Sequence, residues 1–316
     1  MMKRFIYLVL TVVVAVGILG ACGTKGNTTG SDTKKSTGGS YVPKSLTVGF
    51  VPSQNADTLE AKAKPLGDLL SKQLGIPVKV TVTTDYNSII AAMKSKNLDL
   101  GFLPPTAYVL AHQQGAANVL LQAERYGVNP ANGKATSDLV DYYYALMLVK
   151  KNSGINSVSD LKGKKIAWQD PTSSAGYVWP AVYMKDHGVD AQKDVTGVQV
   201  QGHDKAIEAL MNGDVDAAAV FSDARNIVSK EYPDIWNQTK VLFQTAKIPN
   251  DTISVRPDMS ADWQKKIQDA FVAIGNDPKG KKIIESIYTH EGYAKSNDSK
   301  FDIVRDYSKK VTEIGQ

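Results

Sequence analysis

The sequence predicts an α/β fold, because short apolar segments typical of strands alternate with amphipathic segments typical of helices. Helical spacing of apolar residues runs from Leu59 to Leu74 and again from Ile89 to Met93. The strands around these two segments are expected at 46–50, 78–82 and 98–103. The same alternation starts again after residue 142. This order favours βαβ units on a parallel sheet, and two successive α/β lobes are the simplest arrangement.

The first 21 residues have the parts of an export signal. Lys3 and Arg4 form a basic start, and residues 5–18 are almost wholly apolar. This run is shorter than the roughly 20 residues of a membrane-spanning helix and has the length of a signal-peptide core. Leu19-Gly20-Ala21-Cys22 then resembles the lipobox of bacterial lipoproteins. That resemblance implies cleavage before Cys22 and a lipid on this residue, with a retained signal anchor as the alternative.

Residues 22–44 are expected to form a linker. Of the 18 residues from Gly23 to Ser40, 13 are Gly, Ser or Thr and none is a large apolar residue, so this segment cannot contribute to a core. We therefore expect an extracytoplasmic body held at the cell membrane by a lipid on Cys22. The chain has one cysteine, which excludes a disulfide framework and a Cys-based zinc site.

The net charge of +5 falls to +3 once the two basic residues of the leader are removed. Because the remaining charges are spread along the chain, a nucleic-acid partner is not expected.

The body divides most simply into one lobe of residues 45–141 with 250–316 and a second lobe of residues 142–249. In the second half, strands are expected at 142–150, 165–168 and 216–221 and an extended stretch at 241–255, with helices at 175–186, 205–212, 224–232, 261–274 and 280–288. In the first lobe, Pro65 implies a kink or a late start of the first helix.

One motif has the composition of an anion site. Asp170-Pro-Thr-Ser-Ser-Ala-Gly176 follows an expected strand and opens an expected helix, so free N–H groups and the hydroxyls of Ser173 and Ser174 lie at a helix N-terminus. Such a terminus binds anions without Lys or Arg. The alternative is an ordinary helix cap, since Ser and Thr favour that position.

Other polar residues occupy similar strand-to-helix turns. In open α/β sheets the carboxyl ends of the strands form the ligand-binding edge. The residues at such turns, or at the expected lobe crossing, are Thr106, Tyr108, His203, Asp223 and Asp251.

Taken in order, several segments resemble the periplasmic phosphonate, phosphite and phosphate-binding proteins of ABC importers, which have a two-lobed type II binding-protein fold with two crossing segments as hinge. The segments are Asp85 to Ile90, Asp170 to Gly176, Gly202-His203, Val215 to Val220 with Asp223, and Ile248 to Asp251.

The resemblance implies roles for individual residues. Ser173, Ser174 and His203 would donate to the phosphorus-bound oxygens, and Tyr86 would line the pocket. Asp223 and Asp251 match acidic positions that face the amine of an aminoalkylphosphonate. Where some members have a second tyrosine, this chain has Leu103, and Thr106 or Tyr108 would substitute.

The implied function is a receptor, not an enzyme, that delivers a phosphorus oxyanion to an ABC permease and its ATPase, with no cofactor and as a monomer. Two carboxylates favour a ligand that brings an ammonium group or keeps a P–OH proton. A receptor for another small anion and a ligand-sensing lipoprotein are the alternatives. A Ser174–His203–Asp223 hydrolase lacks a nucleophile-elbow motif, and the four histidines lack metal-ligand spacing.

Overall fold

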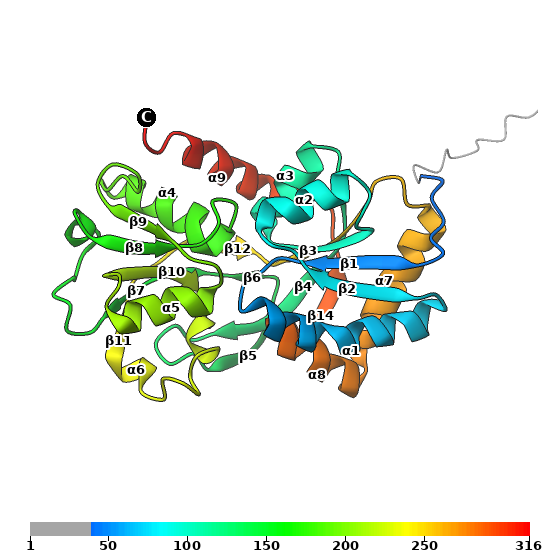
Figure 1. The fold of residues 1–316 in the computed structure, drawn as a ribbon, viewed down its shortest axis with the longest axis horizontal. Coiled ribbons are helices and arrows are strands. Elements are labelled where there is room, and N and C mark those ends of the chain that lie inside the picture. Colours follow the sequence, from blue (N-terminus) through cyan, green and yellow to red (C-terminus); the bar gives the residue numbers. More distant parts are fainter. Residues whose placement is uncertain (1–38) are drawn as a thin grey trace, which may run out of the picture. The chain divides into compact units, whose positions relative to one another are not determined.

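Two β-sheets organise residues 39–316, the part of the chain that the computed structural model describes (Figure 1). The expected leader, the lipidation site Cys22 and most of the expected linker lie outside these residues. None of the helices within 39–316 is both long enough and apolar enough to cross a membrane.

The first sheet has seven strands in the order β14-β4-β13-β3-β1-β2, with β5 paired to β4. These are β1 (Leu46–Phe50), β2 (Val78–Val82), β3 (Leu100–Leu103), β4 (Asn118–Val128), β5 (Ala135–Val140), β13 (Thr252–Val255) and β14 (Gly292–Lys295). Only β1, β2 and β3 run parallel to one another, whereas β13, β4, β14 and β5 pair antiparallel. The expected βαβ units on a parallel sheet are present as β1, β2 and β3 with their connecting helices, and the later strands extend this sheet in the antiparallel direction.

Helices cover both faces of this sheet. On one face α1, α7 and α8 enclose a core that includes Leu66, Phe102 and Phe271, and on the other α2 and α3 pack beside Leu103. Their bounds are α1 (Ala56–Leu74), α2 (Tyr86–Lys94), α3 (Pro105–Gln113), α7 (Ala261–Asn276) and α8 (Pro278–Tyr288).

The helix α1 begins nine residues before Pro65 and continues through it. The Asn55 side chain accepts the backbone N–H of Thr58, which caps the helix at its true start. The late start considered from the sequence is therefore wrong.

The second sheet has five strands in the order β11-β7-β10-β8-β9. These are β7 (Ala145–Lys150), β8 (Lys165–Trp168), β9 (Thr196–Gln199), β10 (Ala217–Phe221) and β11 (Thr239–Gln244), covered by α4 (Trp179–Asp186), α5 (His203–Asn212) and the short α6 (Ile235–Gln238). Here β8 is parallel to β9 and β10, and β7 is antiparallel to β10 and β11.

The expected helix at 224–232 is wrong apart from one 3₁₀ turn, Ala224–Asn226. The buried Arg225 side chain donates to the Pro130 carbonyl and to Thr239, so this segment is held against neighbouring loops instead of presenting a helical face. Pro233 then disfavours helical backbone at its end.

The chain passes between the sheets through a two-stranded ribbon, in which β6 (Tyr142–Tyr143) pairs antiparallel with β12 (Ile248–Pro249). The boundaries suggested from the sequence, 142 and 249, fall in this ribbon. The last helix, α9 (Asp302–Thr312), was not foreseen; it contacts α3 beside the first sheet and α4 beside the second. Tyr307 of α9 stacks on Trp179 of α4, with ring centroids 4.3 Å apart.

Ordered contacts begin before residue 45, within the expected linker. The Tyr41 backbone bonds to Asp258 and Ser260, and its ring lies against the Arg256 guanidinium, 3.8 Å from centroid to carbon. The segment after residue 39 is therefore attached to the first lobe.

Candidate functional site

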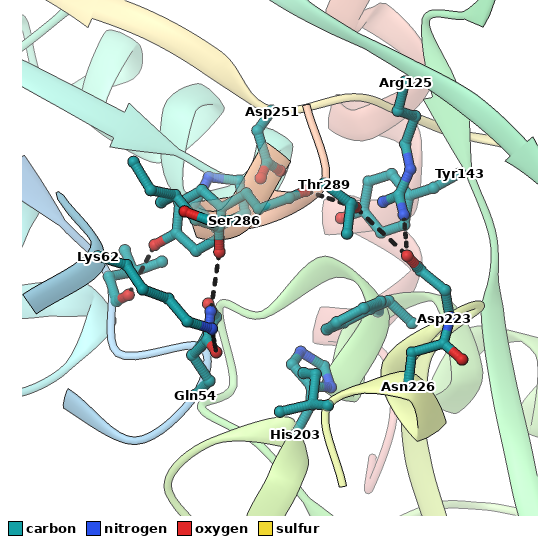
Figure 2. A pocket seen from close by; sticks show the side chains of 18 of the residues that line it. Gln54, Lys62, Arg125, Tyr143, His203, Asp223, Asn226, Asp251, Ser286 and Thr289 are labelled. Atoms are coloured by element: carbon teal, nitrogen blue, oxygen red, sulfur yellow. Dashed lines mark hydrogen bonds and ion pairs between the residues drawn. The ribbon is translucent and has the colours of Figure 1, made fainter. Parts of the chain in front are cut away.

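A cavity of about 480 Å³ lies between the two sheets and takes side chains from both (Figure 2). Of the seven ligand residues expected from the sequence, five line it, namely Tyr86, Ser173, His203, Asp223 and Asp251. The other two, Thr106 and Ser174, do not.

Tyr86 is placed by a capped helix start. It is the first residue of α2, and the preceding Asp85 caps that helix by accepting the backbone N–H of Ser88 at 2.7 Å. Burial raises the pKa of the Tyr86 phenol, so the hydroxyl stays protonated and able to donate.

Ser173 caps the turn of π-helix Ser174–Val178, which continues into α4. Its Oγ accepts the N–H of Gly176 at 3.1 Å, which leaves the hydroxyl proton free to donate into the cavity. A side chain at Gly176 would meet Gln169, since an added Cβ would lie 2.2 Å from Gln169 Cγ. The turn therefore needs a glycine there.

Thr106 and Ser174 contact each other outside the cavity lining, and Ser174 follows Ser173 in the chain. Their hydroxyls are 2.8 Å apart, and Ser174 Oγ also accepts the N–H of Thr106 at 3.1 Å, so the two buried residues join α3 to the serine turn. Tyr108, considered as a substitute for the second tyrosine, donates instead to Asp298 and does not line the cavity.

His203 is held as a neutral imidazole. Its backbone N–H bonds to Ser53, and Gln169 bonds both the N–H and the carbonyl of the preceding Gly202, whose φ of 99° suits glycine. Burial lowers the pKa of His203 to about 3. Within residues 39–316 its Nδ1 has no hydrogen-bond partner. A neutral ring with an unused nitrogen can donate to an oxyanion without carrying charge.

The sequence reasoning missed Arg125, which changes the setting of Asp223. Arg125 Nη2 lies 2.5 Å from Asp223 Oδ2, and Thr289 Oγ1 is 3.3 Å from the same oxygen. Both charged side chains are buried, and they come from different lobes, Arg125 from β4 and Asp223 from the turn after β10. Asp223 is therefore the counter-ion of Arg125. No motif marks an arginine within an apolar strand, so no sequence signal identified it.

Asp251 has no comparable partner. Its nearest basic group in the described chain is His290 Nε2, 3.8 Å from Oδ2, and burial lowers the pKa of His290. Burial, with the Asp251 charge nearby, raises the pKa of four phenols around it, those of Tyr86, Tyr143, Tyr288 and Tyr293. A carboxylate among neutral aromatic rings suits an ammonium group, which gains both ion pairing and contact with ring faces.

Several cavity residues were not foreseen from the sequence. Tyr143 belongs to the crossing ribbon, and the remainder lie on the loop before α1, on α1 itself, after β10 and at the end of α8; they include Gln54, Lys62, Asn226, Lys230, Ser286, Tyr288 and Thr289.

Two other kinds of site considered from the sequence are a hydrolase triad and a metal centre. Ser174, His203 and Asp223 make no hydrogen bonds to one another, so the hydrolase triad is not assembled. Within residues 39–316 no group of three or more His, Cys, Asp or Glu side chains could hold a metal ion.

Comparison with known families and proteins gives a consistent result. A family model described as the periplasmic substrate-binding protein of phosphonate ABC transporters matches residues 48–301. The phosphate-import protein PhnD of Mycolicibacterium smegmatis is 27% identical over 78% of this chain and 77% of its own length. The phosphonates-binding periplasmic protein of Escherichia coli is 24% identical over 77% of this chain and 70% of its own.

Solved structures share the fold. PhnD1 of Prochlorococcus marinus in complex with methylphosphonate superposes with a TM-score of 0.74 at 20% identity, covering 86% of this chain and all of that one. A binding component of a phosphonate ABC transporter from Pseudomonas aeruginosa gives the same TM-score at 23% identity, over 84% and 86% of the two chains. These likenesses establish the two-lobed type II binding-protein fold.

The two cavity aspartates should respond differently to loss of charge. Asp223→Asn leaves Arg125 buried without its counter-ion and should lower the free energy of unfolding by about 3–5 kcal/mol. Asp251→Asn removes a carboxylate with no Lys or Arg partner and should change it by no more than about 1 kcal/mol. Urea unfolding of the ligand-free protein measures both, and equal losses would contradict the assignment.

His203 should make stability depend on pH. Its pKa is about 3 in the folded protein against the ordinary 6.5, so below pH 6.5 the unfolded chain binds a proton that the folded chain does not. Stability should therefore fall as pH drops from 6.5 towards 3, by up to about 1.4 kcal/mol per pH unit for this group. His203→Gln should flatten that slope in denaturation curves at pH 7, 6, 5 and 4. An unchanged slope would show that His203 does not remain neutral.

Proposed function

This chain belongs to the family of periplasmic substrate-binding proteins of phosphonate ABC transporters, and it is the extracytoplasmic receptor of such an importer. From that membership we propose that its ligand is an aminoalkylphosphonate, bound in the cavity between the lobes. The observation that carries the proposal is Asp251, a carboxylate among tyrosines with no Lys or Arg partner in the described residues, in the same cavity as the neutral donors Ser173 and His203.

In this proposal the phosphonate oxygens accept hydrogen bonds from neutral donors. The Ser173 hydroxyl, the Tyr86 hydroxyl and the His203 imidazole each supply an N–H or O–H group without a charge. Hydrogen bonds of this kind become strong for an oxyanion once water is excluded. Ser174 and Thr106 act through Ser173, because they fix the turn that presents it.

The ligand's ammonium group pairs with Asp251. A bare oxyanion dianion placed beside this carboxylate would be repelled, whereas an ammonium offsets its charge. Asp223 does not take that role, because Arg125 already compensates it. Relatives are named for phosphate, phosphonate and phosphite. In this proposal Asp251 favours an amine-bearing phosphonate over the other two ligands.

Beyond the cavity, the proposal includes a permease with its ATPase as partners, a monomeric receptor and no catalysis. Lipidation of Cys22 would hold the receptor at the outer face of the cell membrane, as the lipobox-like segment indicates.

Ligand titrations of two variants should distinguish the phosphonate-binding role of Ser173 from the ammonium-binding role of Asp251. Ser173→Ala removes a donor to the phosphonate, so affinities for 2-aminoethylphosphonate and methylphosphonate should both fall about 10- to 100-fold. Asp251→Asn should weaken 2-aminoethylphosphonate by a similar factor and leave methylphosphonate unchanged or tighter. Isothermal calorimetry at one pH measures all four affinities.

Asp138→Asn is the matched charge control, because Asp138 is exposed on β5 and away from the cavity. It should change neither affinity. If Asp251→Asn weakens both ligands equally while Ser173→Ala affects neither, the assigned roles are wrong.

Lipidation can be tested by itself. Wild-type protein should begin at a lipid-modified Cys22 and fractionate with membranes, whereas Cys22→Ala should accumulate as precursor or appear in the medium. Mass spectrometry of the N-terminal peptide decides the matter, and an intact, unmodified segment from Met1 to Cys22 in the wild type would refute the anchor.

A further inference from the structure

We propose that the cavity also binds a second anionic group of the ligand, a carboxylate, through Lys62 on α1 and Lys230 of the facing lobe. The natural ligand class is then a phosphonate that carries a carboxylate as well as an amine. This inference rests on the proposed function and deepens it, because it names what occupies the part of the cavity that a small phosphonate leaves empty.

The cavity is larger than a simple oxyanion. Its volume of about 480 Å³ equals that of roughly 16 liquid waters at about 30 Å³ each. A phosphonate group of five heavy atoms fills only a small part of that space. The remaining space is lined by side chains with their own chemistry, so the substituent on phosphorus is where these residues would contribute to recognition.

Lys62 brings an uncompensated positive charge to this space. It lines the cavity and is partly buried, yet no carboxylate of residues 39–316 lies within 4 Å of its ammonium. Its one hydrogen bond runs to Gln54 Oε1 at 3.2 Å, and Gln54 is itself anchored because its Nε2 donates to the Ile287 carbonyl at 2.8 Å. An ammonium has three donors, so two remain for a ligand.

A second ammonium lines the same cavity from the other lobe. Lys230 also has no carboxylate within 4 Å among the described residues. Burial lowers the pKa of Lys62, and the charge of Lys230 lowers it further, while Asp204 acts in the opposite direction. Asp204 Oδ2 is engaged by the Asn55 N–H at 3.0 Å. An anion bound between Lys62 and Lys230 would interact favourably with both ammonium groups.

The charges are distributed around the cavity. Figure 2 shows Lys62 with Gln54 at one side and the Arg125–Asp223 pair at the other, with Asp251 and His203 between them. Arg125 is paired with Asp223, whereas Lys62 and Lys230 have no carboxylate of the described residues within 4 Å. A ligand with all three groups would place its phosphonate against Ser173 and His203. Its ammonium would pair with Asp251, and its carboxylate would lie between Lys62 and Lys230.

The test compares two ligands that differ by one carboxylate, 2-aminoethylphosphonate and 2-amino-3-phosphonopropionate. Calorimetry on the purified full chain should give at least about tenfold tighter binding of the carboxylate-bearing compound, the effect expected of one charge-assisted hydrogen bond. In Lys62→Met this preference should shrink to about threefold or less, while binding of 2-aminoethylphosphonate stays close to wild type and shows that the variant is folded. Lys230→Met should reduce the preference in part.

Lys64→Met is the matched control, since Lys64 is exposed on the same helix outside this cavity. It should leave the preference unchanged. Equal affinity of the wild type for both compounds, or a preference that survives in Lys62→Met, overturns the carboxylate subsite while the phosphonate receptor stands. Failure of every phosphonate to bind overturns the proposed function and the subsite together.

Discussion

A buried ion pair between the two lobes, Arg125 with Asp223, sets the electrostatics of the whole cavity. Both side chains are largely buried, so each charge depends on the other for compensation. Because Arg125 offsets the charge of Asp223, Asp251 is the carboxylate of the cavity lining that has no Lys or Arg partner among the described residues. The pair also comes from opposite lobes, so the charge pattern that a ligand meets exists only when β4 and the turn after β10 are brought together.

The anion-binding part of the cavity works without formal charge. Ser173, Tyr86 and His203 are all neutral, and their geometry is fixed from behind by Thr106, Ser174, Asp85 and Gln169. Fixed neutral dipoles recognise the shape and hydrogen-bonding capacity of an oxyanion and add no long-range attraction for unrelated anions. Discrimination among phosphorus compounds then depends on the charged residues, which would interact with the substituent on phosphorus.

Much of the fold and five of the residues that line the cavity could be predicted from the sequence. Alternating strand and helix patterns located β1–β3, α1, α7 and α8. The turns with Ser173 and His203 stood out because their residue types suit strand-to-helix junctions, and Asp251 stood out because it lies at the expected lobe crossing. Arg125 could not be predicted as a site residue, because its partner Asp223 lies 98 residues away in the sequence and belongs to the other lobe. Nor could the sequence show that Asp223 is already paired, that Ser174 faces Thr106, or that Lys62 on an amphipathic helix turns towards a cavity. The expected helix at 224–232 is wrong for a related reason, because the contacts that bury Arg225 are made with residues outside this segment.

The C-terminal helix adds a third connection between the lobes beside the two strands of the crossing ribbon. α9 packs on α3 and α4 and stacks Tyr307 on Trp179, yet no cavity-lining residue lies beyond Thr289. Any movement that separates the lobes must either carry this helix with one lobe or break its packing on the other. If the receptor exchanges between separated and closed forms, the packing of α9 on both lobes contributes to their balance, and through it to the apparent affinity for ligand. Substitutions on α9 could tune how tightly the receptor holds its cargo without changing what it recognises.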